Sequence, residues 1–306
     1  MALKDTIAFG MSLPHRSADP IPAAVIRRVA VRAEALGFAD LWVTENTLDE
    51  AHCLDSLTVL TYAAAVTTTI RLGVSVLVLP THHPVHVAHR SATLDHLSGG
   101  RAILGVGLGK AEHYAPFQVT ADRRVRRLVE SVALIKALWA GAHATYHGEI
   151  FRVDDVTLGT RPAQQPHPPI WMGGAHPDAI RRAAALGDGW MGGGGSSVAS
   201  FARAVPLLHE ALQEGGRDPA TFPISKRVFL SVHDDPAVAR DEVEHWFNTV
   251  YRDPSCIESA GVFGTPAQVR EQLAELVAMG ANHLLLNPVS RYHEQTEALA
   301  EVVGLP

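Results

Sequence analysis

Short apolar or β-branched runs alternate with longer stretches rich in Ala, Leu and Arg along nearly the whole chain. The runs with the length and composition of strands are residues 7–10, 41–43, 72–79, 102–106, 170–172, 189–191, 228–232 and 283–286. The helix-like stretches that follow them are residues 23–36, 56–66, 85–97, 123–140, 178–186, 198–214, 236–250 and 266–279. Strands that alternate with helices run parallel and are joined by right-handed crossovers. Eight such units predict an α/β fold closed into a (β/α)8 TIM barrel, with an open doubly wound sheet as the competing architecture.

Several helix boundaries carry their own signals. Thr265 places a capping hydroxyl directly before Pro266, a residue that suits the first helical position. Gly37 and Gly280 each follow a helix-like stretch, where a left-handed residue often closes the last turn. These signals predict that a strand follows each glycine after a short turn.

One segment, residues 142–169, breaks the alternation. Alternating side chains around Gly148 predict a small β-hairpin, and the prolines near its end exclude a helix. A segment this short cannot bury a core of its own. We therefore expect a single domain over residues 1–306, with a short insertion between the fourth helix and the fifth strand, near the catalytic mouth.

Composition limits the partners of the chain. Its 306 residues suit one barrel, and 47% hydrophobic residues supply a large core. Acidic residues outnumber Lys and Arg by 32 to 26, a net charge of −6 that disfavours binding to nucleic acid. Cys53 and Cys256 form no CxxC pattern, and no run reaches the ~18 apolar residues that span a bilayer. The sequence predicts a soluble, cytoplasmic protein that acts on a small molecule.

Glycine-rich loops follow the fourth, fifth and sixth predicted strands. In a barrel these loops lie at the carboxyl ends of the strands, where active sites are built. Their amide groups, together with helix starts near Pro177 and Ser197, can bind a phosphate. None of them matches a Walker or dinucleotide-binding motif. Each loop alone is more often just a tight strand exit. Three such loops on neighbouring strands leave a phosphate site and a plain strand exit as balanced interpretations.

Polar side chains also follow these strands. Glu45 and Asn46 come directly after the second strand, and they indicate either a functional site or an ion pair at the rim. His113 follows the glycines after the fourth strand and is a candidate pocket residue, whereas Lys110 could pair with Glu45, contact substrate or be solvated. His82, His86 and His89 have near-helical spacing without a carboxylate or an HExxH motif, so we expect no metal site. The chain has no G-x-S-x-G motif, which gives little support to a hydrolase.

An ordered set of motifs closely resembles the luciferase-like monooxygenase superfamily. The matching segments are residues 72–80, 83–85, 92–101, 104–107, 167–174, 186–190 and 264–266. The resemblance extends from Ile7 to about Val289, and the nearest branch uses the deazaflavin coenzyme F420. Each motif alone is unspecific, whereas the ordered set is specific.

The resemblance implies a flavin-type ring in the barrel mouth, held over a cis peptide bond that matches Ser75–Val76. It implies cofactor phosphate contacts from two loops, Gly173-Gly174-Ala175 and Gly193-Gly194-Gly195. It implies ring and ribityl contacts from Glu45, Asn46, Gly107, Gly109 and His113. Members of the family are often homodimers, and some depend on a partner reductase for reduced flavin or F420.

The sequence departs from the sugar-phosphate dehydrogenases of that branch. Their second strand ends in Asp-His with a catalytic histidine, where this chain has Glu45 and Asn46, and their acidic residue after the strand-four glycines is here Lys110. We therefore expect hydride transfer between reduced F420 and an unsaturated or carbonyl substrate, with Glu45, Asn46 and His113 as catalytic candidates. The alternatives are an FMN-dependent two-component monooxygenase, which uses reduced FMN and oxygen, and a non-catalytic cofactor-binding barrel.

Overall fold

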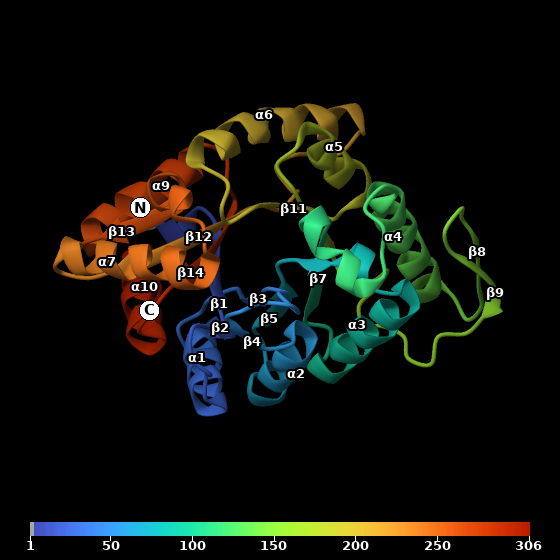
Figure 1. Ribbon diagram of the computed structural model, residues 1–306, viewed down its shortest axis with the longest axis horizontal. Coiled ribbons are helices and arrows are strands. Elements are labelled where there is room, and N and C mark those ends of the chain that lie inside the picture. The colour runs from blue at the N-terminus through green and yellow to red at the C-terminus, as the bar shows by residue number, and fades with distance from the viewer. Residues whose placement is uncertain (1–2) are drawn as a thin grey trace.

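The computed structural model describes residues 3–306, and its centre is a closed barrel of parallel strands (Figure 1). The barrel strands are β1 (Ala8–Ser12), β3 (Asp40–Val43), β5 (Arg71–Val74), β7 (Ala102–Gly107), β10 (Ile170–Gly173), β11 (Gly189–Gly192), β12 (Ile224–Val232) and β14 (His283–Pro288). Each strand pairs in parallel with its neighbours, and the pairing of β10 with β7 completes the ring. The predicted TIM barrel is therefore confirmed, and the open doubly wound sheet is excluded.

Helices surround the barrel on its outer side (Figure 1). They are α1 (Ala23–Ala35), α2 (Ser56–Val66), α3 (Pro84–Ser98), α4 (Arg124–Ala140), α5 (Pro177–Leu186), α6 (Val198–Glu214), α7 (Pro236–Trp246), α9 (Pro266–Ala278) and α10 (Tyr292–Val303). All except α10 were expected within a few residues, although π-helical turns replace the end of the seventh predicted helix at Phe247–Tyr251. The sequence analysis missed α10 because no capping side chain marks its start at Arg291.

The predicted helix boundaries have the expected geometry. Thr265 and Gln268 form a reciprocal capping box at the start of α9, with Pro266 in the first turn. Gly37 and Gly280 adopt φ values of 79° and 104°, a conformation that side chains rarely adopt. Both glycines lead directly into a strand of the barrel.

Two strands differ from the sequence prediction. The third predicted strand is interrupted, because β5 ends at Val74 and a second short strand, β6 (Leu77–Val78), continues after it. The peptide bond between them, Ser75–Val76, is cis, as the resemblance implied. Strand β12 starts at Ile224 rather than at residue 228, and an unpredicted strand, β13 (Gly261–Gly264), pairs with it outside the ring.

The insertion forms the expected hairpin, with strands β8 (Ala144–His147) and β9 (Arg152–Val156). The buried carboxylate of Glu130 on α4 accepts hydrogen bonds from the amides of residues 149–151 at the hairpin turn. Figure 1 shows the hairpin outside α4, away from the barrel axis. Next to the hairpin turn, the ring of Phe151 packs against His83 of the loop after β6, with the two ring centroids 5.6 Å apart.

Large side chains fill the interior of the barrel. Trp42 and Trp171 pack with their ring centroids 5.2 Å apart, together with Met191 and Leu285. Beside them lies the buried carboxylate of Asp40. The lumen is therefore a packed core, and space for a ligand exists only at its end.

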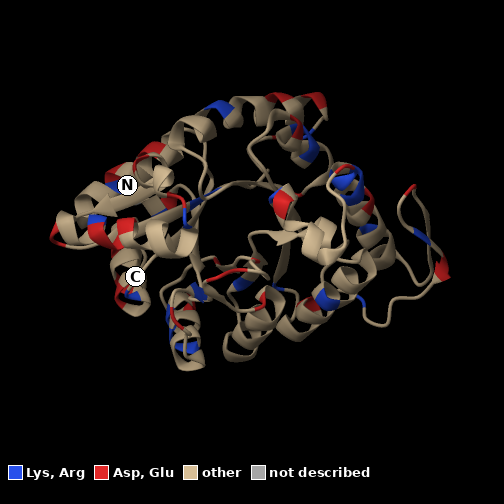
Figure 2. Cartoon of the chain, viewed as in Figure 1, with Lys and Arg blue, Asp and Glu red and all other residues tan. Residues whose placement is uncertain are grey.

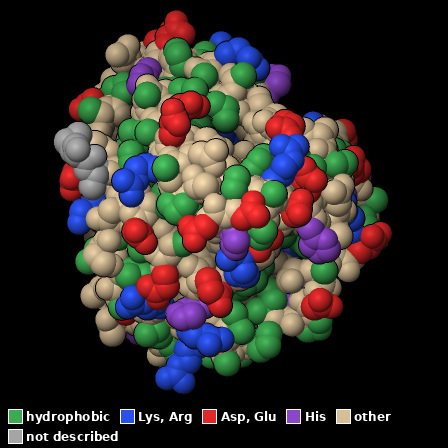
Figure 3. All heavy atoms as spheres, turned by 90° about the vertical axis from the view of Figure 1, so that its left-hand side faces the viewer, with side chains coloured by type: hydrophobic (Ala, Val, Ile, Leu, Met, Phe, Trp, Pro, Cys, Tyr) green, Lys and Arg blue, Asp and Glu red, His purple; other side chains and the backbone are tan. Residues whose placement is uncertain are grey.

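Charged residues lie mainly on the outer helices rather than on the barrel strands (Figure 2). On the face that carries α7, side chains of both signs are interspersed with apolar ones, as Figure 3 shows. Within residues 3–306, no helix has the length and apolar composition needed to cross a membrane.

Candidate active site

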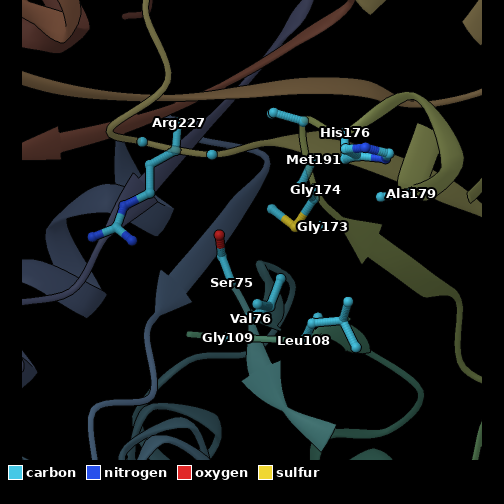
Figure 4. A pocket seen from close by; sticks show the side chains of 15 residues that line it. Ser75, Val76, Leu108, Gly109, Gly173, Gly174, His176, Ala179, Met191 and Arg227 are labelled. Atoms are coloured by element: carbon cyan, nitrogen blue, oxygen red, sulfur yellow. The ribbon is translucent and has the colours of Figure 1, made fainter. Parts of the chain in front are cut away.

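A pocket of about 330 Å³ opens at the carboxyl ends of the barrel strands (Figure 4). It lies where β5, β7, β10 and β11 end, and Arg227 of the neighbouring strand β12 also lines it. Of the sequence-predicted cofactor residues, those that line it are Ser75, Val76, Gly107, Gly109, Gly173, Gly174, Ala175, Gly193 and Gly194. The structure thus brings together nearly the whole set that was expected to hold a cofactor.

Backbone amides of the glycine loops are available to a ligand. The N–H groups of Ala175, Gly194 and Gly195 donate to no other group of the described chain. The N–H of Gly174 differs, because it donates to the carbonyl of Met191 at 3.3 Å. Free amides from two adjacent loops can converge on one anionic oxygen group.

Small residues keep this pocket open. A Cβ atom added to Gly107 would lie 2.6 Å from the Val76 side chain, so only glycine fits beside the cis peptide. A Cβ atom on Gly193 would meet no atom within 4 Å, because that position faces open space. Gly195 is the predicted residue of this loop that does not line the pocket, and a Cβ atom there would collide with Tyr251.

Glu45 lies behind the pocket rather than on its wall. Its carboxylate accepts the amide hydrogen of Val78 at 2.5 Å and contacts Nε2 of His82 at 2.6 Å. The side chain is 8% exposed. Glu45 therefore holds β6, the short strand that directly follows the cis peptide.

Asn46 is also held within the protein. Its amide nitrogen donates to Oγ1 of Thr44 at 3.1 Å, and Thr44 contacts Nε2 of the buried His15 at 2.8 Å. Burial lowers the pKa of His15 to about 3, so its imidazole is neutral. Asn46 thus belongs to a hydrogen-bonded group beside the mouth and does not line the pocket.

His113 and Lys110 lie on an exposed turn after β7. The His113 side chain is 61% exposed, and its nearest ionic partner is Glu112, 3.6 Å away. Lys110 contacts Glu112 at 3.8 Å rather than Glu45. The structure therefore does not bring His113 together with Glu45, Asn46 or the glycine loops. No group of three His, Cys, Asp or Glu residues within the described chain is arranged to hold a metal.

Arg227 is a pocket residue that the sequence analysis missed. Figure 4 shows its guanidinium opposite His176 and the glycines after β10. Its Nε and Nη2 donate to Oδ1 of Asn287 at 3.1 and 2.8 Å, and the guanidinium lies 4.5 Å from the ring centroid of Phe229. Burial lowers the pKa of Arg227 to about 10, which leaves it charged at neutral pH. The signal in the sequence was the basic pair Lys226-Arg227 inside an apolar strand.

Comparisons with known proteins identify the family of the chain. The family model described as luciferase-like monooxygenase matches residues 7–261. The chain is 32% identical over 240 residues to the F420-dependent glucose-6-phosphate dehydrogenase of Kineococcus radiotolerans, covering 75% of this chain and 70% of that protein.

Two solved structures share the fold. An F420-dependent secondary alcohol dehydrogenase in complex with an F420-acetone adduct superposes with a TM-score of 0.83 at 22% identity, covering 97% of this chain and 98% of that one. A monooxygenase from Streptomyces bottropensis also gives a TM-score of 0.83, at 23% identity, covering 98% of this chain and 97% of that one.

Proposed function

This chain belongs to the luciferase-like monooxygenase family, and from that premise we propose that it transfers a hydride between reduced coenzyme F420 and an unsaturated or carbonyl small molecule. The choice of F420 rests on the dehydrogenase from Kineococcus radiotolerans, which is named for this coenzyme and aligns over three quarters of the chain. The substrate class is an inference from the pocket and from the departures at Glu45 and Asn46.

The observation that carries the proposal is one cavity that joins the Ser75–Val76 bond to the free amides after β10 and β11. A planar ring can pack on Val76, whose side chain is seated against Gly107 at the pocket wall. A phosphate group at the other end of the cofactor can accept hydrogen bonds from the amides of Ala175 and Gly194.

F420, when bound, supplies a two-electron hydride carrier that reacts poorly with oxygen. The chain would contribute orientation and charge. Arg227 lines the pocket across from the glycines after β10 and can stabilise negative charge that develops on a substrate oxygen. Glu45 and Asn46 then act as positioning residues, and we assign His113 no proton transfer, because it lies outside this pocket.

Replacing Gly193 by valine is expected to weaken F420 binding at least tenfold, or about 1.4 kcal/mol. The new side chain would occupy open space at the pocket wall, where no protein atom lies within 4 Å. The measurement is a fluorescence titration of purified protein with F420. Thermal unfolding should stay unchanged, and Gly193→Ala should give a smaller loss of affinity. An unaltered titration curve for a folded valine variant would remove the cofactor from this loop.

The function itself is tested by titrating the purified protein with F420 and with FMN side by side. Anaerobic oxidation of reduced F420 is then followed against a panel of enones, imines and ketones. We expect tight F420 binding and substrate-dependent oxidation. If reduced FMN with oxygen yields an oxygenated product while F420 neither binds nor turns over, the two-component monooxygenase is the correct assignment.

A further inference from the structure

Lys226 is a buried lysine beneath the loop that follows β11. Residues of β12 alternate in direction, because Ser225 bonds to His283 inside the barrel and Arg227 lines the pocket. Lys226 therefore points to the outer face, beside its register partner Gly192 at the end of β11. It is only 2% exposed.

The ammonium group of Lys226 donates hydrogen bonds to several carbonyl groups of this loop. Its Nζ donates to the carbonyl oxygens of Gly193 at 2.7 Å and Ser196 at 2.8 Å, and to Oγ of Ser196 at 3.2 Å. The carbonyl of Gly194 lies 3.4 Å from the same nitrogen. The three protons of the ammonium group thus all have acceptors within one loop.

No carboxylate neutralises this charge. Among the ion pairs of the described residues, none includes Lys226. Burial, and then the charge of Arg227, lower the pKa of Lys226 to about 7. A negative group on the far side of the loop would favour the charged form of the amine.

The loop itself lies between Lys226 and the pocket. Its carbonyl groups are held on the Lys226 side, whereas the N–H groups of Gly194 and Gly195 have no partner in the described chain. Gly193 and Gly194 line the pocket. The carbonyl of Gly193 also accepts hydrogen bonds from the amide and the hydroxyl of Ser196, at 3.1 and 2.5 Å. Without the lysine, the turn would keep these internal bonds but lose its attachment to β12, so its amides would no longer be fixed toward the pocket.

We propose that Lys226 is a positioning residue that fixes the amides of the glycine loop toward the cofactor's phosphate and makes the site select phosphate-bearing cofactors over their dephosphorylated forms. This inference rests on the proposed cofactor site. It assigns Lys226 no contact with the ring or the substrate. Its effect should therefore depend on whether the ligand carries a phosphate.

The test compares two ligands that differ in that group. Wild type and Lys226→Met are titrated with F420 and with the same deazaflavin ring carrying only its ribityl chain. We expect Lys226→Met to bind F420 at least tenfold more weakly and to bind the ribityl compound within about threefold of wild type, because only the phosphate accepts hydrogen bonds from the loop amides. FMN and riboflavin provide a second pair that differs in the phosphate alone, whereas the ribityl compound lacks the whole phosphate-linked tail of F420.

Two further variants distinguish the effect of the lysine charge from a general effect of losing a buried lysine. Lys226→Gln keeps an amide donor for the loop carbonyls without the positive charge. It replaces Lys226→Met in the test if the methionine variant is unstable. We expect it to lose part of the preference for F420 over the ribityl compound. Lys136→Met is the matched control, because Lys136 also donates to a backbone carbonyl, that of Leu186 at 2.8 Å, but does not line the pocket. It should change neither affinity.

The outcomes distinguish this inference from the proposed function. Equal losses for both ligands in the Lys226 variants, or an unchanged preference for F420, would overturn the role of Lys226. If wild type binds the two ligands equally, the phosphate site at the glycine loops is wrong, and the inference falls with it.

Discussion

Replacing Arg227 by methionine is expected to lower the turnover of reduced F420 roughly a hundred- to a thousandfold, the range seen when one donor to a developing negative charge is removed. Arg227 lines the pocket, and its guanidinium donates hydrogen bonds to the neutral amide oxygen of Asn287. Its positive charge is therefore uncompensated by a carboxylate among the described contacts. A substrate oxygen that gains negative charge during hydride transfer would supply the missing partner.

The measurement is steady-state kinetics under anaerobic conditions, together with the affinity for oxidised F420. Affinity should change by less than about threefold, because the proposed cofactor phosphate is bound by the amides of the glycine loops and not by the guanidinium. Arg227→Lys should recover part of the rate, since it keeps the charge but lacks the planar pair of donors.

Arg217→Met is the matched control for this experiment. Arg217 also lies over an aromatic ring, 4.7 Å from the centroid of Phe222, and donates to the carbonyls of Ala184 and Gly187. It precedes β12, at the opposite end of that strand from the pocket. If both variants lose the same amount of turnover, Arg227 has a structural role and the proposed substrate contact is wrong.

Replacing Asp40 by alanine is expected to lower the free energy of unfolding by about 3–5 kcal/mol, the cost of breaking a buried ionic pair from one side. The Asp40 carboxylate is fully buried. It accepts hydrogen bonds from Trp42 Nε1 at 2.5 Å and Arg71 at 2.9 Å, and it contacts His283 Nε2 at 2.9 Å. Alanine would leave the tryptophan and the histidine without their partner inside the barrel.

Urea unfolding at neutral pH measures this effect, with an unchanged slope expected if the variant keeps the native fold. The control is Asp154→Ala, because Asp154 forms a similar pair with His147 on the exposed hairpin. Little change is expected there, since exposed pairs contribute little to stability. A small effect at both positions would show that the buried group is not important for stability.

Stability should also depend on acidity through Asp40. Burial raises the pKa of this carboxyl, but the charge and hydrogen bond of His283, with Arg71 and Trp42, outweigh burial and leave the pKa below its usual value. A lowered pKa in the folded state stabilises the protein above the unfolded value, about 4, and this stabilisation is lost as pH falls further. Wild type should therefore lose its advantage over Asp40→Ala in acid.

Ser225, His283 and Asp40 are also linked in the order of a hydrolase triad, with Ser225 Oγ 2.8 Å from His283 Nδ1. All three residues are buried, with exposures of 0–2%. Because no ligand can reach the serine hydroxyl there, the arrangement is part of the barrel core. A triad-like arrangement that no substrate can reach therefore does not indicate a catalytic site.

The sequence predicted the barrel well because strand and helix periods are local properties. It misplaced the start of β12, because Lys226 and Arg227 looked too polar for a buried strand. Both cations fit within the strand because its side chains alternate in direction. Lys226 lies under the loop after β11, and Arg227 lines the pocket.

The sequence indicated which glycines line the pocket but not where the side chains of Glu45, Asn46 and His113 lie, and the binding roles of all of them stay predictions. The glycine loops contribute through the backbone, so their position at the strand ends was enough to place them in the pocket. Glu45 follows a strand just as directly, yet its side chain turns behind β6. The direction of a side chain after a strand depends on tertiary contacts that a sequence pattern does not contain.

The alternation of β12 also constrains how this enzyme can be redesigned. Lys226 and Arg227 are adjacent in sequence but lie on opposite faces of one strand. A one-residue shift of the strand would exchange the two cations, so insertions and deletions there should alter coenzyme and substrate preference together. A library that aims at new substrates should therefore hold the strand register fixed and vary Arg227 and Asn287 by substitution alone.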